Sequence, residues 1–500
     1  MIDGAWHRLH PASPLLRGGI ALIAILGVVI ANLRERLMDL VIPGSGESRD
    51  DPIDYIVGHG LVGLVLLGVA VLLLLLIGAF FLAWRMHTYR ITSDVVEVRS
   101  GILFRTSRRA RLDRIQGINI VRPFFARIFG AAKLEISQAG HDANLQLAYL
   151  SSAQADALRR EILLLASGST ATATAAATAP PAGSLIDRRM GELVAPELDP
   201  DLAPPESVVK IDLGRLLGSL LLSGTSVAIV LMAAAAIVWV AVTGHLLALA
   251  FLLPAAIGVG SFYVRRFTKS LRYSVAGTPD GVRVGFGLLS TSNETLPPGR
   301  IHSIRIAQPL LWRPAGWWEI SVNRAGRSST KGAAGQPNTT ILPVGDLGDV
   351  RRVLGLILPD LLQSEAVEEL SLALTTEGGD RFTVSPPRAA VVRPLSWHRN
   401  GFALAPGLLL LRKGIVWRQL VIVPQARLQS ISLEQGPLLR LLTLARVHLH
   451  TVAGPVQARL TGIDGDAALA FFERVAVAVV RSADSDSTHR WGAPGREGAP

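Results

Sequence analysis

Long apolar runs alternate along the chain with stretches in which apolar and polar residues are mixed. Four runs are long enough to be considered as membrane-spanning helices. They cover residues 18–33, 56–84, 216–242 and 246–264. The second run has no polar face, unlike a core helix of a soluble protein. The runs lie close together in pairs, so the pattern predicts two transmembrane hairpins, over residues 1–88 and 208–268.

Basic residues next to these runs indicate the orientation of the chain. Lysine and arginine follow the second and fourth runs, whereas acidic residues outnumber basic ones between the first two runs. Because positively charged flanks stay in the cytoplasm, both termini and all folded parts are expected at the cytoplasmic face of the inner membrane. The first run also fits a signal peptide, with Arg8 and Arg17 before it, but the small-residue cleavage pattern is weak.

The mixed stretches contain three copies of one motif. The copies read RIQGINIVRPFFARIFGAAKLEISQAG from Arg114, RIHSIRIAQPLLWRPAGWWEISVNRAG from Arg300 and RLQSISLEQGPLLRLLTLARVHLHTVAG from Arg427. A strand–turn–strand pattern precedes each copy. The turns of this pattern are predicted at Ser100-Gly101, Asp280-Gly281 and Asn400-Gly401.

Each motif ends in a strand and is followed by an amphipathic helix. Trp318, Ile320 and Val322 alternate with polar residues, which is typical of a strand with one buried face. Ser151 and Gln154 form a capping-box pattern before the first helix. The predicted N-caps of the other two helices are Asp346 and Asp466. Each unit is therefore expected to contain several antiparallel strands and one terminal helix.

A small antiparallel barrel closed by an amphipathic helix is a pleckstrin-homology-like (PH-like) arrangement. The segment SGILFRTSRRARLDRIQGINIVRPFFARIFGAAKLEISQAG, with the order of paired spans and repeated units, resembles a family of bacterial membrane proteins with repeated PH-like domains, the YdbT-like group. The resemblance implies an α+β membrane protein with four transmembrane helices in two hairpins. It also implies three PH-like antiparallel β-barrel domains, each closed by a C-terminal helix.

The predicted layout places PH-like domains after both hairpins and again at the end of the chain. The PH-like domains are expected over residues 89–166, 269–363 and 391–483. The stretch over 167–207 is of low complexity and rich in small or polar residues, so it cannot build a core. We expect a low-complexity linker there, a second linker over 364–390 and a disordered tail over 484–500.

Composition narrows the function further. The net charge is +11, and the mean hydropathy of +0.39 is high for a soluble protein. Basic and aromatic residues are not interleaved, so nucleic acid is not an expected partner. The absence of cysteine excludes disulfides, thiol catalysis and cysteine-ligated metals. His448 and His450 share a strand face without an evident third ligand, so we expect no metal site. The sequence contains no Walker A, G-x-S-x-G or H-E-x-x-H string, so we expect no cofactor and no enzyme activity.

Two groups of residues are candidates for binding. The first group is a basic segment, which serves either as a topology determinant or as a contact for phosphate or an anionic lipid headgroup. It consists of Arg105, Arg108, Arg109, Arg111 and Arg114. The second group lies in the apolar turn of the motif and forms either a plug for the barrel or a wedge for the membrane or a partner. It consists of Phe124, Phe125, Ile128 and Phe129.

We therefore expect a non-enzymatic integral membrane protein whose cytoplasmic PH-like domains act as a scaffold or binding module at the inner membrane surface. Membrane lipids, through an anionic headgroup, and a peptide or protein are the expected partners. A related membrane protein of the same family is one candidate. The alternative is a component of an export or antimicrobial-resistance system that handles small amphiphiles or peptides. The spans carry almost no ionisable residues, which argues against a transporter.

Overall fold

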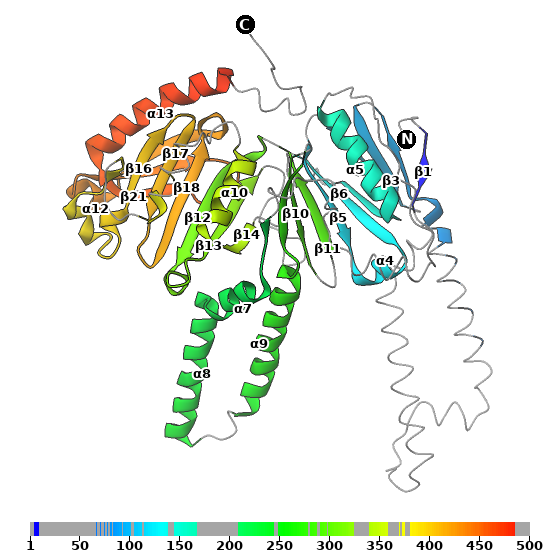
Figure 1. Cartoon of the computed structure of the whole chain (residues 1–500), viewed down its shortest axis with the longest axis horizontal. Coiled ribbons are helices and arrows are strands. Elements are labelled where there is room, and N and C mark those ends of the chain that lie inside the picture. The colour runs from blue at the N-terminus through cyan, green and yellow to red at the C-terminus, as the bar shows by residue number, and fades with distance from the viewer. Residues whose placement is uncertain are drawn as a thin grey trace.

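The computed structural model places three β-rich modules in a row, from which helices project on one side (Figure 1). It describes residues 5–9, 84–92, 94–101, 105–112, 115–138, 145–167, 209–244, 249–278, 281–287, 291–297, 299–324, 340–358 and 381–485, with single residues between 67 and 82 and between 370 and 375. The first predicted span, most of the second, the low-complexity linker and most of the predicted tail lie outside the described residues.

The three modules repeat one order of elements, in which a two-residue strand precedes six longer strands and a helix. The first module contains β1 (His7–Arg8), β2 (Thr88–Ile91), β3 (Val95–Ser100), β4 (Thr106–Arg111), β5 (Ile115–Arg122), α4 (Phe124–Ile128), β6 (Ala131–Gln138), β7 (Leu145–Ser151) and α5 (Ser152–Ser167). The second contains β8 (Val209–Lys210), β9 (Ser274–Thr278), β10 (Gly281–Phe286), β11 (Thr291–Leu296), β12 (Ile301–Pro309), η5 (Leu310–Trp312), β13 (Trp318–Arg324), β14 (Thr340–Gly345) and α10 (Leu347–Ile357).

The third module follows the same order. It contains β15 (Thr383–Val384), η6 (Pro387–Val391), η7 (Trp397–Arg399), β16 (Gly401–Ala405), β17 (Leu408–Lys413), β18 (Trp417–Pro424), η8 (Gln425–Arg427), β19 (Ser430–Glu434), α12 (Pro437–Leu441), β20 (Leu444–His450), β21 (Arg459–Asp464) and α13 (Gly465–Ser485). The helix lies on the outer side of the module in Figure 1. Two short 3-10 helices, η6 and η7, connect β15 to β16.

Neighbouring modules share their sheets. β5 of the first module pairs with β11 of the second, and β12 of the second pairs with β18 of the third, always antiparallel. Two seven-stranded sheets result, in the orders β7-β6-β5-β11-β10-β9-β8 and β14-β13-β12-β18-β17-β16-β15. A four-stranded sheet, β1-β2-β3-β4, and a three-stranded sheet, β19-β20-β21, stand at the two ends of the row.

The predicted antiparallel α+β architecture is confirmed, but the individually closed barrels are wrong. Within the described strands of the first module, β4 and β5 belong to different sheets and do not pair. The strand that would close the barrel pairs with the next module instead, which satisfies the same backbone N–H and C=O groups. Each module is therefore an open sandwich of two sheets.

Each core lies between two sheets and one helix. In the first module, Val96 of β3, Leu134 of β6 and Leu158 of α5 belong to one buried cluster. In the second module, Trp318 and Ile320 of β13 are buried in a cluster that includes residues of α10. The predicted alternation of β13 is thus confirmed on its apolar face. The opposite face is covered too, because the third module packs against it.

A helical pair projects from the second module. α7 (Leu213–Leu221), α8 (Gly224–Thr243) and α9 (Leu249–Ser270) are inserted between β8 and β9. The most apolar 18-residue stretch of the 20-residue helix α8 has a mean hydropathy of 2.5, and only 6% of this stretch is buried. A helix of this length measures about 30 Å, the thickness of the hydrocarbon core of a bilayer.

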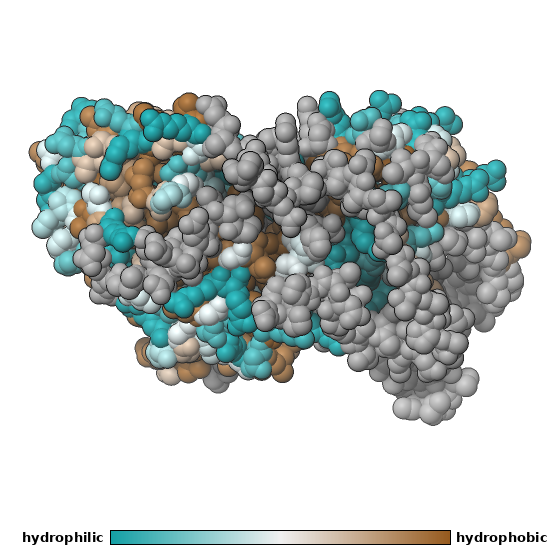
Figure 2. Space-filling model, turned by 45° about the horizontal axis from the view of Figure 1, so that its top comes forward, coloured by the Kyte–Doolittle hydropathy of each residue, from teal (hydrophilic) through white to brown (hydrophobic). Residues whose placement is uncertain are grey.

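Within the described residues, α8 is the one helix that is long and apolar enough to cross a membrane. α9 covers most of the predicted fourth span and runs beside α8 in Figure 1. By contrast, Figure 2 shows hydrophilic residues over much of the first and third modules, at the two ends of the row. A membrane-inserted part is therefore supported, whereas four spans in two hairpins stay a prediction.

Most of the predicted helix starts are confirmed. The backbone N–H of Gln154 donates to the Ser151 hydroxyl, and the Gln154 side chain accepts from the backbone N–H of Ser151. Asp346 caps α10 in a full capping box with Asp349. The prediction of Asp466 is wrong, since Asp464 accepts the first N–H groups of α13 and Asp466 lies inside the helix.

The predicted turns differ between copies. Ser100-Gly101 lies between β3 and β4 as predicted, and Gly281, with a φ of 119°, follows the connection from β9 to β10. Asn400-Gly401 is not a turn, because Gly401 begins β16 and pairs with Val384 of β15. The hairpin between β16 and β17 turns at Gly407, which has a φ of 70°.

Candidate functional site

Helix α7 lies at the base of the helical pair and fixes it to the second module. Asp212 caps α7 by accepting the backbone N–H groups of Gly214 and Arg215. The Arg215 guanidinium donates to the carboxylates of Asp346 and Asp349, over 3.2 and 3.1 Å. Both carboxylates belong to the capping box of α10. The start of α10 and the start of α7 are therefore held together by charge-assisted hydrogen bonds.

Two glycines bring the base of the pair close to indole rings. A Cβ atom at Gly218 would lie 2.5 Å from the ring of Trp317, and one at Gly224 would lie 3.2 Å from the ring of Trp417. Trp417 belongs to β18, so the third module also reaches the first residue of α8. The junction of the second and third modules thus forms a platform for α8.

A polar break separates α7 from α8. The Ser223 hydroxyl caps α8 by accepting the backbone N–H of Ser226. The Ser226 hydroxyl donates to the carbonyl oxygen of Leu220, and the Tyr263 hydroxyl of α9 donates to Ser226, each over 2.5 Å. The structure thus differs from the single predicted span over residues 216–242. The sequence is apolar on both sides of this point. The helix is nevertheless interrupted between α7 and α8, where serine hydroxyls form hydrogen bonds with backbone groups.

One face of α7 is apolar and exposed. Leu213, Leu217 and Leu221 recur at every fourth residue and are exposed, whereas Leu216 and Leu220 are buried against the module. Residues four apart share one helix face. A short helix with an exposed leucine stripe, placed directly before a span, has the character of an interfacial helix.

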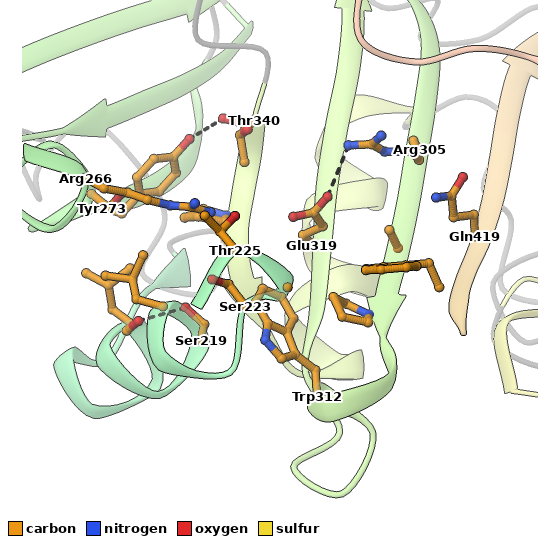
Figure 3. A pocket seen from close by; sticks show the side chains of 18 of the residues that line it. Ser219, Ser223, Thr225, Arg266, Tyr273, Arg305, Trp312, Glu319, Thr340 and Gln419 are labelled. Atoms are coloured by element: carbon orange, nitrogen blue, oxygen red, sulfur yellow. Dashed lines mark hydrogen bonds and ion pairs between the residues drawn. The ribbon is translucent and has the colours of Figure 1, made fainter. Parts of the chain in front are cut away.

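A cavity of about 670 Å³ opens between α7, the base of the pair and the strands of the second and third modules. Figure 3 shows Ser219, Ser223 and Thr225 on its helical side, and Arg305, Glu319 and Gln419 on its strand side. Tyr273 lies near the rim and donates to the carbonyl oxygen of Thr340. Apolar side chains complete the wall. They include Leu216, Leu220, Phe286, Trp312 and Trp417.

The charges inside this cavity are partly balanced. Arg305 of β12 and Glu319 of β13 point toward each other and form an ion pair of 3.1 Å (Figure 3). Burial raises the pKa of Glu319 above its usual value, although the charges of Arg305 and Arg266 counteract this in part. The cavity therefore offers apolar walls together with one ion pair and several hydroxyl groups.

A second hollow, of about 450 Å³, lies beside the cavity and shares Arg305, Trp417 and Gln419 with it. Its other walls come from the third module and carry Arg393, Lys413 and Arg459. We call it the cationic hollow and define it by Arg305, Arg393, Lys413 and Arg459. Apart from the Arg305–Glu319 pair, none of these cations has a carboxylate partner within the described residues.

Burial and the neighbouring positive charges lower the pKa values of two of these groups. Burial, followed by the charges of Arg393, Arg459 and Arg305, lowers the pKa of Lys413 to about 8. Burial, followed by Arg459 and Arg446, lowers the pKa of Arg393 as well. The Lys413 ammonium donates to the carbonyl oxygens of Gln457 and Arg459, over 3.0 and 3.4 Å. An anion in the hollow would relieve this repulsion.

The arrangement is suited to binding an anion. The cationic hollow provides guanidinium and ammonium donors, which match the oxygens of a phosphate or carboxylate. The adjoining cavity provides apolar walls next to the start of α8. Among the described residues, no cluster of three or more histidine and acidic side chains could hold a metal ion. Together the two hollows fit a molecule with an anionic group and an apolar part.

The structure places the predicted basic segment elsewhere, on the edge strand β4. Arg108, Arg109 and Arg111 are exposed on β4, and Arg105 is exposed just before it. Arg114 lies outside the described residues. These arginines belong to the first module and do not line either hollow. Their role as a contact for an anionic headgroup stays a prediction.

One carboxylate organises the outer face of this edge. Glu97 of β3 accepts from the Ser107 hydroxyl over 2.9 Å and from Arg90 over 2.7 Å, and Arg109 lies 3.5 Å away. Burial raises its pKa, but the Ser107 and Arg90 hydrogen bonds and the charge of Arg109 outweigh burial and lower the pKa to about 2. Glu97 therefore stays ionised and holds part of the basic segment in place.

The apolar turns of the three motifs are α4, η5 and α12. Ile128 and Phe129 are exposed, whereas the side chains of Phe124 and Phe125 lie outside the described part of the chain. In the other copies, Trp312 of η5 and Leu439 of α12 are buried beside exposed leucines. Each of these two turns thus has one side chain that packs and others that do not. A role as a membrane or partner wedge stays a prediction.

The sequence did not reveal the cationic hollow. Its residues come from β12, β17, the start of β21 and the connection after η6, and only Arg305 belongs to the repeated motif. The motif copies do show one signal, because Arg305 stands where Asn119 and Ser432 stand in the other copies. This position is charged in one copy of the motif and uncharged in the other two. The sequence alone could therefore have marked Arg305 as unusual.

Fold and site define a class of protein: three repeated antiparallel modules share sheets, one helix is able to span a membrane, and a cationic hollow lies beside it. The chain belongs to the bacterial PH domain family, whose sequence profile matches residues 23–166, 216–361 and 364–479. It is also 31% identical over 102 residues to the UPF0699 transmembrane protein YdbT of Bacillus subtilis (strain 168). That similarity spans 20% of this chain and 20% of the relative.

Proposed function

We propose that the chain is a non-enzymatic integral membrane protein whose bacterial PH modules form a binding platform at the inner membrane surface. In this proposal the cationic hollow holds the phosphate group of an anionic amphiphile, and the adjoining cavity accepts its apolar part. The modules and both termini then lie in the cytoplasm. The distant relative is named a transmembrane protein, which agrees with a membrane location.

One observation carries the proposal. Arg393, Lys413 and Arg459 line one hollow without a carboxylate partner within the described residues. Uncompensated cations in a partly buried place are costly unless an anion joins them. Trp417 connects this hollow to Gly224, the first residue of α8. In this proposal the hollow lies where α8 enters the membrane, at the depth of lipid headgroups.

The test uses the full chain, purified in a neutral detergent. It is titrated with a short-chain phosphatidylglycerol and, separately, with glycerophosphoglycerol, which is the same phosphodiester without acyl chains. Binding is followed by the fluorescence of the tryptophans, since Trp417 lines the hollow. Tighter binding of the lipid than of the headgroup alone identifies an amphiphile as the ligand. Equal binding identifies a soluble phosphodiester.

Variants assign the binding to the hollow. Arg393→Gln, Lys413→Gln and Arg459→Gln should each weaken binding by about tenfold or more, because each removes a charge-assisted contact of about 1.5–3 kcal/mol. Arg351→Gln is the matched control, since Arg351 is exposed on α10 and lines neither hollow. Unchanged affinity in the three hollow variants, or no binding of either probe, refutes the proposal.

The larger cavity supports a second candidate function, a component of an export or resistance system for small amphiphiles. Its volume of about 670 Å³ and its mixed walls are within the range of sites for drug-sized molecules. In that case cells that lack the chain should retain more of an added amphiphilic peptide than cells that carry it. Equal retention in the two strains removes this candidate.

A further inference from the structure

The strands at the two ends of the row have free edges. The corresponding strands inside the row pair with a neighbouring module. Inside the chain, the first strand after each motif arginine pairs with the last strand before the next one: β5 with β11, and β12 with β18. In the described part of the structure, β4 has only β3 as a neighbour, and β19 has only β20. β4 corresponds to β11 and β18, and β19 corresponds to β5 and β12.

The two internal junctions have the same register. Ile118 and Ile304 each stand four residues after the motif arginine, and Thr295 and Ile422 each stand five residues before it. Ile118 pairs with Thr295, and Ile304 pairs with Ile422. An identical register at two junctions with different side chains shows that the shape of the modules, rather than one set of contacts, sets the alignment.

Burial differs between the internal junctions and the free ends. At the junctions, Ile118, Ile120, Ile304 and Ile306 are all 0% exposed. Their counterparts in β19 are Ile431 and Leu433, which are only half-buried. On the other free edge, every residue of β4 except Ala110 is exposed, whereas every residue of β11 is buried.

We propose that copies of this chain assemble head to tail, with β19 of one copy paired to β4 of the next in the register of the internal junctions. That register places Ile431 opposite Arg109, Ser432 opposite Arg108 and Glu434 opposite Thr106. Glu434 then lies diagonally from Arg108 on the same face, a distance at which long side chains interact. The proposal does not depend on the ligand of the cationic hollow.

We infer a second copy of the chain as the partner because the two free edges are complementary. β19 corresponds to one strand of each internal junction, and β4 corresponds to the other. The chain already uses this junction twice, so the backbone hydrogen bonds and the sandwich shape are proven within the molecule. The two edges differ from each other, so the contact is heterologous and leads to a ring or an open row. In Figure 1, α8 and α9 project from one side of the row, so joined copies can share one membrane.

The absence of cysteine from the chain permits a clean crosslinking test. Thr106→Cys and Glu434→Cys place one thiol on each free edge, at positions that the register puts opposite each other. A mixture of the two single variants, purified and reconstituted in vesicles, should give a disulfide-linked dimer under mild oxidation. One chain that carries both substitutions should give a ladder of higher species on a non-reducing gel.

The control shifts the register by one residue. Arg105→Cys with Glu434→Cys keeps both thiols exposed but points them to opposite faces of the paired strands, so crosslinking should fall by about tenfold. Matching melting temperatures establish that all variants are folded. Monomer alone from the Thr106→Cys and Glu434→Cys mixture overturns the proposal, and so does equal crosslinking in the shifted pair.

Discussion

The charge state of Lys413 gives binding at the cationic hollow a defined dependence on pH. With a pKa of about 8, roughly nine in ten Lys413 side chains are charged at pH 7 and roughly one in ten at pH 9. If the anion requires the charged amine, affinity should fall by about tenfold between these two values, or about 1.4 kcal/mol. Conversely, the bound anion should raise the pKa of Lys413, because an opposite charge favours the ammonium form.

The assay measures the affinity of the full chain for short-chain phosphatidylglycerol at pH 7, 8 and 9. A phosphodiester is the right probe because its own charge does not change in this range. Lys413→Arg keeps a permanent charge and should remove the pH dependence while retaining affinity at pH 7. Lys413→Gln should also remove the pH dependence, but at the weaker affinity that wild type approaches at pH 9.

Two results would refute this reasoning. The first is a wild-type affinity that stays constant from pH 7 to pH 9. The second is a drop that persists in Lys413→Arg, since another group would then control the titration. Either result would mean that the charge of Lys413 does not control the affinity for the anion between pH 7 and pH 9.

Three substitutions test the packing of α7 and the stability of α10, each followed by thermal unfolding. Gly218→Leu should destabilise the chain by about 1–3 kcal/mol, because its Cβ would overlap the Trp317 ring. Gly355→Ala should stabilise it by about 0.5–1 kcal/mol, since nothing lies within 4 Å of that helical position. Asp346→Ala should cost about 1 kcal/mol by removing the cap of α10. An unchanged melting temperature in Gly218→Leu would contradict the contact with Trp317.

Features that depend on neighbours in sequence were predicted well. The alternation of Trp318 and Ile320 with polar residues placed a strand correctly, since side chains of a strand point alternately to two faces. The caps at Ser151 and Asp346 depend on hydrogen bonds within four residues, and both are confirmed. The prediction of Asp466 as an N-cap was wrong because Asp464, two residues earlier, is an equally good capping residue. Asp464 accepts the free N–H groups at the start of α13.

Features that depend on distant partners were not predicted. The motif identifies β5 and β12 as strands, but an unpaired strand edge carries no mark of which strand will join it. The polar residues Asn293 and Glu294 of β11 are buried at a junction between modules, and their neighbours in sequence do not indicate this burial. The cationic hollow was not predicted for a similar reason. Lys413 and Arg459 are 46 residues apart in sequence and meet only in the folded chain.

The sheets that cross from one module to the next determine how the chain can be cut. A fragment that ends after α5 or begins at β9 would split a seven-stranded sheet and uncover a row of backbone donors and acceptors beside apolar side chains. Such a fragment has the properties of an aggregation seed rather than of an independent folding unit. Genetic dissection of this protein should therefore rely on point substitutions in the intact chain.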